Sequence, residues 1–165
     1  MKKLSWLLAL LVILAAPIQG GLADKTDAAT PYSPAEYTAE YEKAAAALLA
    51  HTPDAVVDYA VRERDDGRYE WDLFFDLNGR LGVCEVIEPD FSVRRIQFYD
   101  MPEGALTASQ IVEALMREKG EIRIIDLELD FDDGRLRYEG VAELTGKRYE
   151  FELGINGKII EWERD

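Results

Sequence analysis

The chain has few of the residues that support covalent or metal-based chemistry. Its 165 residues include one cysteine, Cys84, and one histidine, His51. A single cysteine excludes a disulfide within the chain, and with one histidine it cannot make a zinc site of the usual Cys/His kinds. No Gly-x-Ser-x-Gly, glycine-rich phosphate loop or His-Glu-x-x-His motif is present. The sequence therefore predicts no enzyme, no cofactor and no metal site.

Basic side chains are also scarce. Nineteen Lys and Arg residues stand against 33 Asp and Glu residues, which gives a formal net charge of −14 at pH 7. Nucleic acids and anionic membrane surfaces attract proteins that have a basic face. We therefore expect neither of them as a partner of this chain.

Only the start of the chain has a long apolar run. Lys2 and Lys3 precede apolar residues 4–16, and a short positive start followed by such a core is typical of a secretory signal peptide. The run is shorter than the roughly 20 residues that cross a bilayer. We expect residues 1–23 to be a cleaved signal peptide and residues 24–33 a mobile leader. The mature protein is then periplasmic, has no membrane anchor, and carries a charge of −16 instead of −14 because two lysines are lost.

The rest of the chain contains an internal repeat with a constant shift. The tetrapeptide Asp-Asp-Gly-Arg occurs at 65–68 and again at 132–135, 67 residues later. Two further pairs of turn residues align at this shift: Asn78-Gly79 with Thr145-Gly146, and Pro89-Asp90 with Asn156-Gly157. Pairs of this kind close β-hairpins. The matches predict a duplication, with one repeat at 34–101 and the second at 102–165.

Each repeat is predicted to begin with a helix and continue with four strands. Apolar spacings of three or four indicate helices that begin at Ser33-Pro34 and Thr107 and end near His51 and Gly120. The strands are expected at 55–64, 68–77, 80–88, 91–99, 122–131, 135–144, 147–155 and 158–163. Apolar and acidic residues alternate in them, as in half-buried antiparallel strands. The order predicts an α+β fold of two tandem αββββ units, joined edge to edge in an antiparallel sheet with helices packed on one face.

The end of the second repeat resembles the closing hairpin of the PepSY-like family, also described as β-lactamase-inhibitor-like. The resemblance rests on the strand Tyr149-Glu-Phe-Glu-Leu153, the Asn156-Gly157 turn and the Glu-rich end 158–165. The first repeat matches more loosely, at 67–73 and 78–81. The resemblance implies an exported module that binds other proteins, and the family has been linked with inhibition of peptidases or β-lactamases. In the β-lactamase inhibitor proteins, which share a tandem architecture, the open sheet face binds the enzyme, an analogy at the level of the fold alone.

The outward face of the predicted sheet is the candidate partner-binding surface. Its members are acids, together with one apolar residue from each repeat: Glu70, Asp72, Phe74, Asp76, Glu139, Val141, Glu143, Glu150 and Glu152. One hypothesis is a shallow acidic surface with Phe74 as the apolar anchor for a basic or mixed partner. The other is a solvated sheet face without a partner.

The sequence favours an exported, non-enzymatic module that binds another exported protein, with inhibition of a peptidase or other hydrolase as one form of that binding. The alternative is a low-affinity binder of divalent cations or cationic peptides that uses the same acidic face. A hydrolase based on paired carboxylates is disfavoured because nearly all the acids belong to the outward half of a strand. The partner, the oligomeric state, the strand order across the repeats and the state of Cys84 stay open, although burial of this thiol is expected.

Overall fold

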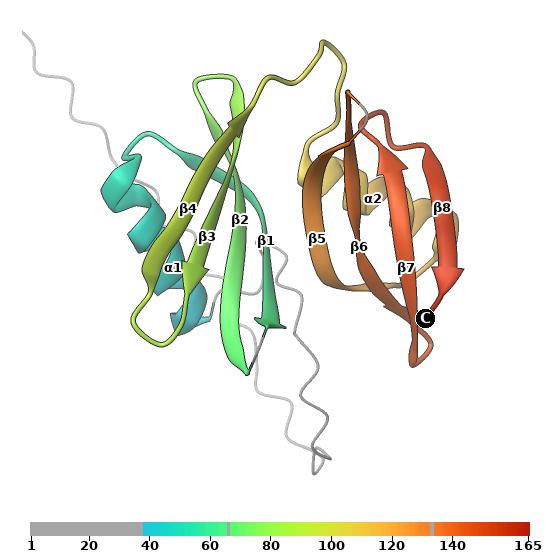
Figure 1. Cartoon of the computed structure of the whole chain (residues 1–165), viewed down its shortest axis with the longest axis horizontal. Coiled ribbons are helices and arrows are strands. Elements are labelled where there is room, and N and C mark those ends of the chain that lie inside the picture. The colour runs from blue at the N-terminus through green and yellow to red at the C-terminus, as the bar shows by residue number, and fades with distance from the viewer. Residues whose placement is uncertain (1–37, 66, 133) are drawn as a thin grey trace, which may run out of the picture.

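The computed structural model describes residues 38–65, 67–132 and 134–165. They form two helices and eight strands (Figure 1). The predicted signal peptide at 1–23 and the leader at 24–33 lie outside the described residues. Within those residues, no helix is long and apolar enough to cross a membrane.

The elements fall into two units of the same order. The first unit contains α1 (Ala39–His51), β1 (Val56–Asp65), β2 (Arg68–Leu77), β3 (Arg80–Ile87) and β4 (Ser92–Tyr99). The second contains α2 (Ala108–Lys119), β5 (Arg123–Asp132), β6 (Arg135–Leu144), β7 (Lys147–Gly154) and β8 (Ile159–Arg164). Strands β1 to β4 make one antiparallel sheet in sequential order, here sheet 1, and β5 to β8 make another, sheet 2. Each sheet is therefore a series of hairpins.

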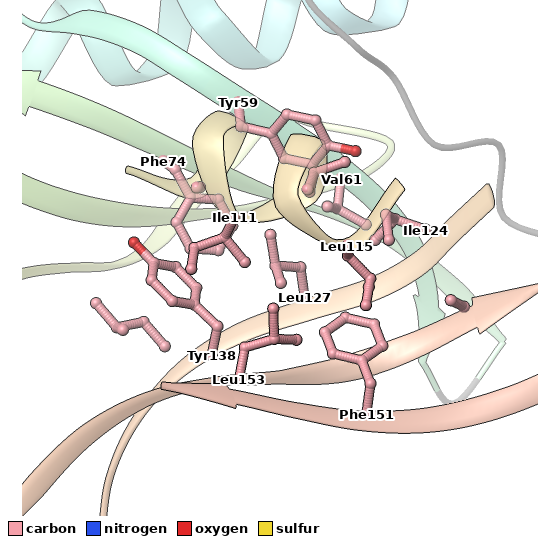
Figure 2. Packing of buried hydrophobic residues seen from close by; sticks show 14 of the residues in the cluster. Tyr59, Val61, Phe74, Ile111, Leu115, Ile124, Leu127, Tyr138, Phe151 and Leu153 are labelled. Atoms are coloured by element: carbon pink, nitrogen blue, oxygen red, sulfur yellow. The ribbon is translucent and has the colours of Figure 1, made fainter. Parts of the chain in front are cut away.

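The predicted α+β fold, with helices packed on one face of a joined antiparallel sheet, is wrong. The described residues are mostly β, and their strands form two separate four-stranded sheets. The helices share no covering layer, because α1 packs on sheet 1 whereas α2 packs between sheet 1 and sheet 2 (Figure 2). The alternation of apolar and acidic residues distinguishes the two faces of a strand, but it does not say which other element covers each face.

Local sequence explains where the hairpins turn and where the helices begin. Asn78 and Gly79 have φ of 56° and 83°, the positive values that a two-residue type I′ turn requires at both positions. Thr145 and Gly146 repeat this geometry with φ of 50° and 74°. Helix α1 begins after Thr38, whose hydroxyl accepts a hydrogen bond from the Tyr41 amide at 3.2 Å. The Ser33-Pro34 start expected from the sequence lies outside the described residues.

Sheet 1 is buried on both faces. On one face, Trp71 and Leu73 of β2 pack against Leu48 of α1. On the other, Phe74 of β2 joins Tyr59 of β1 in a core shared with α2 and sheet 2 (Figure 2). Six consecutive residues of β2 are consequently buried, whereas burial in β6 is interrupted. Sheet 1 is the central layer, and sheet 2 keeps one face open to water.

Cys84 lies in the core between sheet 1 and α1. It is a free and buried cysteine. Burial raises the pKa of its thiol to about 12, with further increases from Asp72 and Glu85. A thiol of this kind stays protonated and unreactive at neutral pH.

Asp58 of β1 joins the two units. The register of β1 against β2 shifts between Val57 and Tyr59, so Asp58 lies at a β-bulge that turns its side chain out of the ladder. Its carboxylate accepts hydrogen bonds from the Ser109 amide at 2.9 Å and the Ser109 hydroxyl at 2.7 Å. The Thr107 hydroxyl donates a third at 3.2 Å. A carboxylate of the first unit thus caps the positive end of a helix in the second.

Candidate functional site

A row of four glutamates crosses the open face of sheet 2. The strand register places one glutamate of each strand directly opposite the next: Glu128 of β5, Glu139 of β6, Glu152 of β7 and Glu161 of β8. Residues opposite each other in a sheet point to the same face, and neighbouring strands lie about 4.8 Å apart. We call this set the glutamate row. Like charges directly opposite each other destabilise a sheet, so the free protein holds this arrangement at a cost.

A second row runs beside the first on the same face. It consists of Asp126, Val141, Glu150 and Glu163, again one residue from each strand. A hollow of about 290 Å³ lies over the two rows. Its lining is Asp126, Glu128, Glu139, Gly140, Val141, Glu150, Phe151, Glu152 and Glu161. We call this surface the acidic face of sheet 2.

The charge of the acidic face is only partly neutralised. Arg137 Nη1 lies 2.7 Å from Glu152 Oε1. Burial raises the pKa of Glu139, and the neighbouring Asp130 and Glu152 raise it further. The pKa of Glu128 is raised in the same way, by burial first and then by Asp126. Shifts in this direction are those of carboxylates that lack enough positive charge nearby.

The structure brings together four of the predicted site residues and separates the others. Glu139, Val141, Glu150 and Glu152 all line the hollow on sheet 2. Glu143 is outside that lining, and its Oε2 accepts a hydrogen bond from Arg123 at 2.7 Å. Asp76 accepts a hydrogen bond from the Gly79 amide at 3.1 Å, so it stabilises the β2–β3 turn.

Phe74 is not an exposed anchor. Its side chain is fully buried, and its ring centroid lies 6.3 Å from that of Tyr138 in sheet 2. The expectation of an exposed residue was wrong because the second unit covers the face of sheet 1 that the prediction left open to water. Phe74 holds the two units together instead of meeting a partner.

Glu70 and Asp72 lie in a cleft between the two units. This inter-unit cleft has a volume of about 390 Å³. Its lining is Glu63, Arg64, Glu70, Asp72, Val83, Glu85, Arg94, Arg95, Tyr99, Leu127, Glu128 and Leu129. Glu70 Oε2 lies 3.3 Å from Arg94 Nη1, and Glu85 pairs with Arg95. Asp72 is only 7% exposed, as is Glu70, but it differs from both Glu70 and Glu85 because no described residue gives it a hydrogen bond or ion pair.

Two carboxyl groups meet where β1 faces β5. Glu63 of the first unit and Asp126 of the second interact electrostatically, and burial, followed by Asp126, raises the pKa of Glu63 to about 8. Burial also raises the pKa of Asp126. Among the described residues, no donor reaches the buried Oδ1 atom of Asp126. A carboxyl pair of this kind retains a proton at neutral pH, because two adjacent carboxylates cannot both ionise freely.

Sequence reasoning missed Glu63, Glu85 and Glu128. Each lies on the same face as a predicted site residue of the next strand: Glu63 is opposite Glu70, Glu85 opposite Asp72, and Glu128 opposite Glu139. The two-residue turn between β2 and β3 fixes the register of that hairpin, so it was the signal that could have found Glu85. In the ranges 38–65, 67–132 and 134–165, no three His, Cys, Asp or Glu side chains are grouped so as to hold a metal ion.

No family model matches the chain, and no curated protein matches it. Among solved structures, the chain is similar to the crystal structure of a "putative lipoprotein" from Clostridium difficile 630. The two are 14% identical with a TM-score of 0.41, and the match covers 86% of this chain and 97% of that chain. A likeness at this level carries no conclusion about function.

Proposed function

We propose that the protein is an exported, non-enzymatic binding module of the PepSY-like kind, and that the acidic face of sheet 2 binds a basic surface of another exported protein. The glutamate row carries this proposal. It places four like charges in line across one sheet, on a face that neither helix covers. A basic partner relieves this repulsion, so part of the binding free energy comes from removing a strain that the free protein already bears.

The composition of the face also fits a protein partner. Val141 lies between Asp126 and Glu150 in the second row, which gives the hollow a small apolar centre within an acidic rim. Charge complementarity at such a rim speeds association and excludes acidic competitors. The sequence at 1–23 supports export, and binding to a peptidase or other hydrolase would make the module an inhibitor.

A pull-down from an exported-protein fraction tests this proposal. The bait is the wild type, the Glu139→Lys/Glu150→Lys double variant, or the control Glu118→Lys. Glu118 is exposed on α2, which packs against the other face of sheet 2, so the control reverses a charge outside the acidic face. We expect the same proteins to be enriched by the wild type and the control and to be lost with the double variant. Equal enrichment with all three baits would refute the proposal.

The alternative function, low-affinity binding of divalent cations, uses the same carboxylates. Oxygen ligands suit Ca²⁺, and the glutamate row supplies them on adjacent strands. No three of the described carboxylates are grouped so as to hold a metal ion in advance, which accords with low affinity. If this alternative holds, millimolar calcium raises the melting temperature of the wild type but not that of Glu139→Gln/Glu152→Gln. No calcium effect on the wild type would exclude it.

A further inference from the structure

The inter-unit cleft contains a buried carboxylate without a counterion. Asp72 lies in the middle of β2, opposite Val61 on β1 and Glu85 on β3. It is 7% exposed and lines the cleft, and no described residue gives it a hydrogen bond or an ion pair. Burial of an unpaired carboxylate is unfavourable. Its position in an open cavity indicates that the missing partner comes from outside the chain.

From this geometry we infer that the inter-unit cleft binds the ammonium end of an alkyl cation, either a lysine side chain or a free alkylamine, with Asp72 as the counterion. This site is separate from the acidic face of sheet 2. The two cavities share Glu128 alone. The inference therefore does not depend on the proposed function.

The lining of the cleft is mainly polar, with a small apolar part that the stem of an alkyl cation can contact. Val83 of β3 and Leu127 and Leu129 of β5 line it together with the ring of Tyr99. The Tyr99 hydroxyl donates a hydrogen bond to the Leu129 carbonyl oxygen at 3.0 Å, which fixes this wall across the two units. The stem of a lysine side chain packs on apolar surface while its charged end meets a polar group. A divalent metal ion instead prefers oxygen ligands on all sides, whereas Arg64, Arg94 and Arg95 share this lining with the carboxylates, so the cleft favours the organic cation.

The ion pairs of the cleft leave Asp72 without a partner. Arg94 and Arg95 each have a side chain that is 58% exposed, and they pair with Glu70 and Glu85 respectively. These pairs neutralise Glu70 and Glu85. Asp72 has no such pair, so its carboxyl group is left to interact with an entering ammonium group. The volume of about 390 Å³ is that of a small-molecule site.

Several titratable and charged groups surround Asp72, from every strand that borders the cleft. They are Glu63 and Arg64 on β1, Glu70 on β2, Glu85 on β3, Arg94, Arg95 and Tyr99 on β4, and Asp126 and Glu128 on β5. Burial, followed by Glu63 and Glu85, raises the pKa of Asp72 well above its usual range. The pKa of Glu63, which also lines the cleft, is raised to about 8, so near neutral pH the free cleft retains a proton. A bound cation favours the ionised carboxylates, so binding releases protons and becomes tighter as the pH rises from about 6 to about 9.

The test is a titration of the isotope-labelled protein followed by the NMR shifts of its backbone amides. The probes are 1,5-diaminopentane and the peptide acetyl-Gly-Lys-Gly-amide, and the control peptide has norleucine in place of lysine. We expect saturable shifts at Asp72, Val83 and Leu127 with both amines and none with norleucine. The Asp72→Asn variant, which keeps the size of the side chain, should bind about tenfold more weakly, the loss of about one charge-assisted contact. Glu150→Gln, on the acidic face of sheet 2, should bind like the wild type.

The outcomes separate the two sources of the cation and the possible failures. Tighter binding of the diamine supports a free alkylamine, and tighter binding of the peptide supports a lysine side chain of a partner protein. Shifts that do not saturate, that centre on the acidic face of sheet 2, or that persist in Asp72→Asn overturn the inference, as does equal saturation of the cleft by calcium. If Asp72→Asn does not fold, the shifts of the wild type with the two amines and with the norleucine peptide still test the inference. Amine binding that is the same at pH 6 and pH 9 overturns the inference.

Discussion

Removal of the Asp58 carboxylate should destabilise the whole protein through the second unit. The Asp58→Ala variant loses the hydrogen bonds from the Ser109 amide and hydroxyl, at 2.9 and 2.7 Å, and the longer one from Thr107. Loss of an N-cap costs about 1 kcal/mol, and hydrogen bonds to a charged group are stronger, about 1.5–3 kcal/mol. These contributions overlap because they involve the same carboxylate. We expect the free energy of unfolding to fall by about 2–3 kcal/mol, which lowers the melting temperature by about 5–10 °C at this chain length.

Urea unfolding followed by tryptophan fluorescence measures this effect in both units at once. Trp71 lies in the core between sheet 1 and α1, and Trp162 packs against the core that includes sheet 2. Because the two units share a core, the Trp71→Phe and Trp162→Phe backgrounds should report the same midpoint and the same shift on Asp58→Ala. Asp54→Ala is the matched control, since Asp54 is exposed just before β1, and it should change stability by less than about 0.5 kcal/mol. If Asp58→Ala is as stable as this control, the capping role is refuted.

Two further predictions concern burial and charge between the units. Phe74→Ala should lower the free energy of unfolding in urea by about 3–5 kcal/mol, because the ring is fully buried. Phe131→Ala, at a side chain that is 64% exposed, should lower it little. Equal losses in the two variants would contradict the shared core. Burial and Asp126 raise the pKa of Glu63 to about 8, so the folded state holds this proton more tightly than the unfolded state, where the pKa is about 4.3. The resulting stabilisation is complete below about pH 4 and is lost as the pH rises through 8. The Glu63→Gln variant should show a flatter decline of melting temperature between pH 5 and 9, and an unchanged decline would argue against the shared proton.

Local features of the fold could be predicted from the sequence. Strand β2 has the bounds that its alternation indicates, Arg68–Leu77, and β6 likewise runs from Arg135 to Leu144. The turns at Asn78-Gly79 and Thr145-Gly146 have the positive φ values that their residues favour. These features depend on neighbouring residues only, so periodicity and turn chemistry are enough to find them.

The packing of one unit on the other could not be predicted by the same reasoning, although one short segment of the sequence indicates it. Leu73, Phe74 and Phe75 are three consecutive apolar residues, which is typical of a strand buried on both faces. The alternation of apolar and acidic residues placed Phe74 on the solvent-exposed face, because it shares that face with Asp72 and Asp76.

The residues of the candidate site show the same difference between local sequence and long-range packing. Glu139, Val141, Glu150 and Glu152 gather in one hollow because hairpin register within a single sheet brings them together. Asp72 lies in a different cavity because the docking of two units decides what surrounds it. That docking depends on contacts between residues far apart in the sequence.

The double coverage of sheet 1 makes the two units unequal. Without α2 and sheet 2, the first unit would expose Tyr59, Val61 and Phe74, which all belong to the shared core. An exposed apolar patch of that kind promotes self-association. Deletion of the second half would therefore leave an insoluble or dimeric remnant in place of a working half-sized module. Sheet 2 instead has an acidic surface on its second face, so the two units differ in what they can offer to a neighbour.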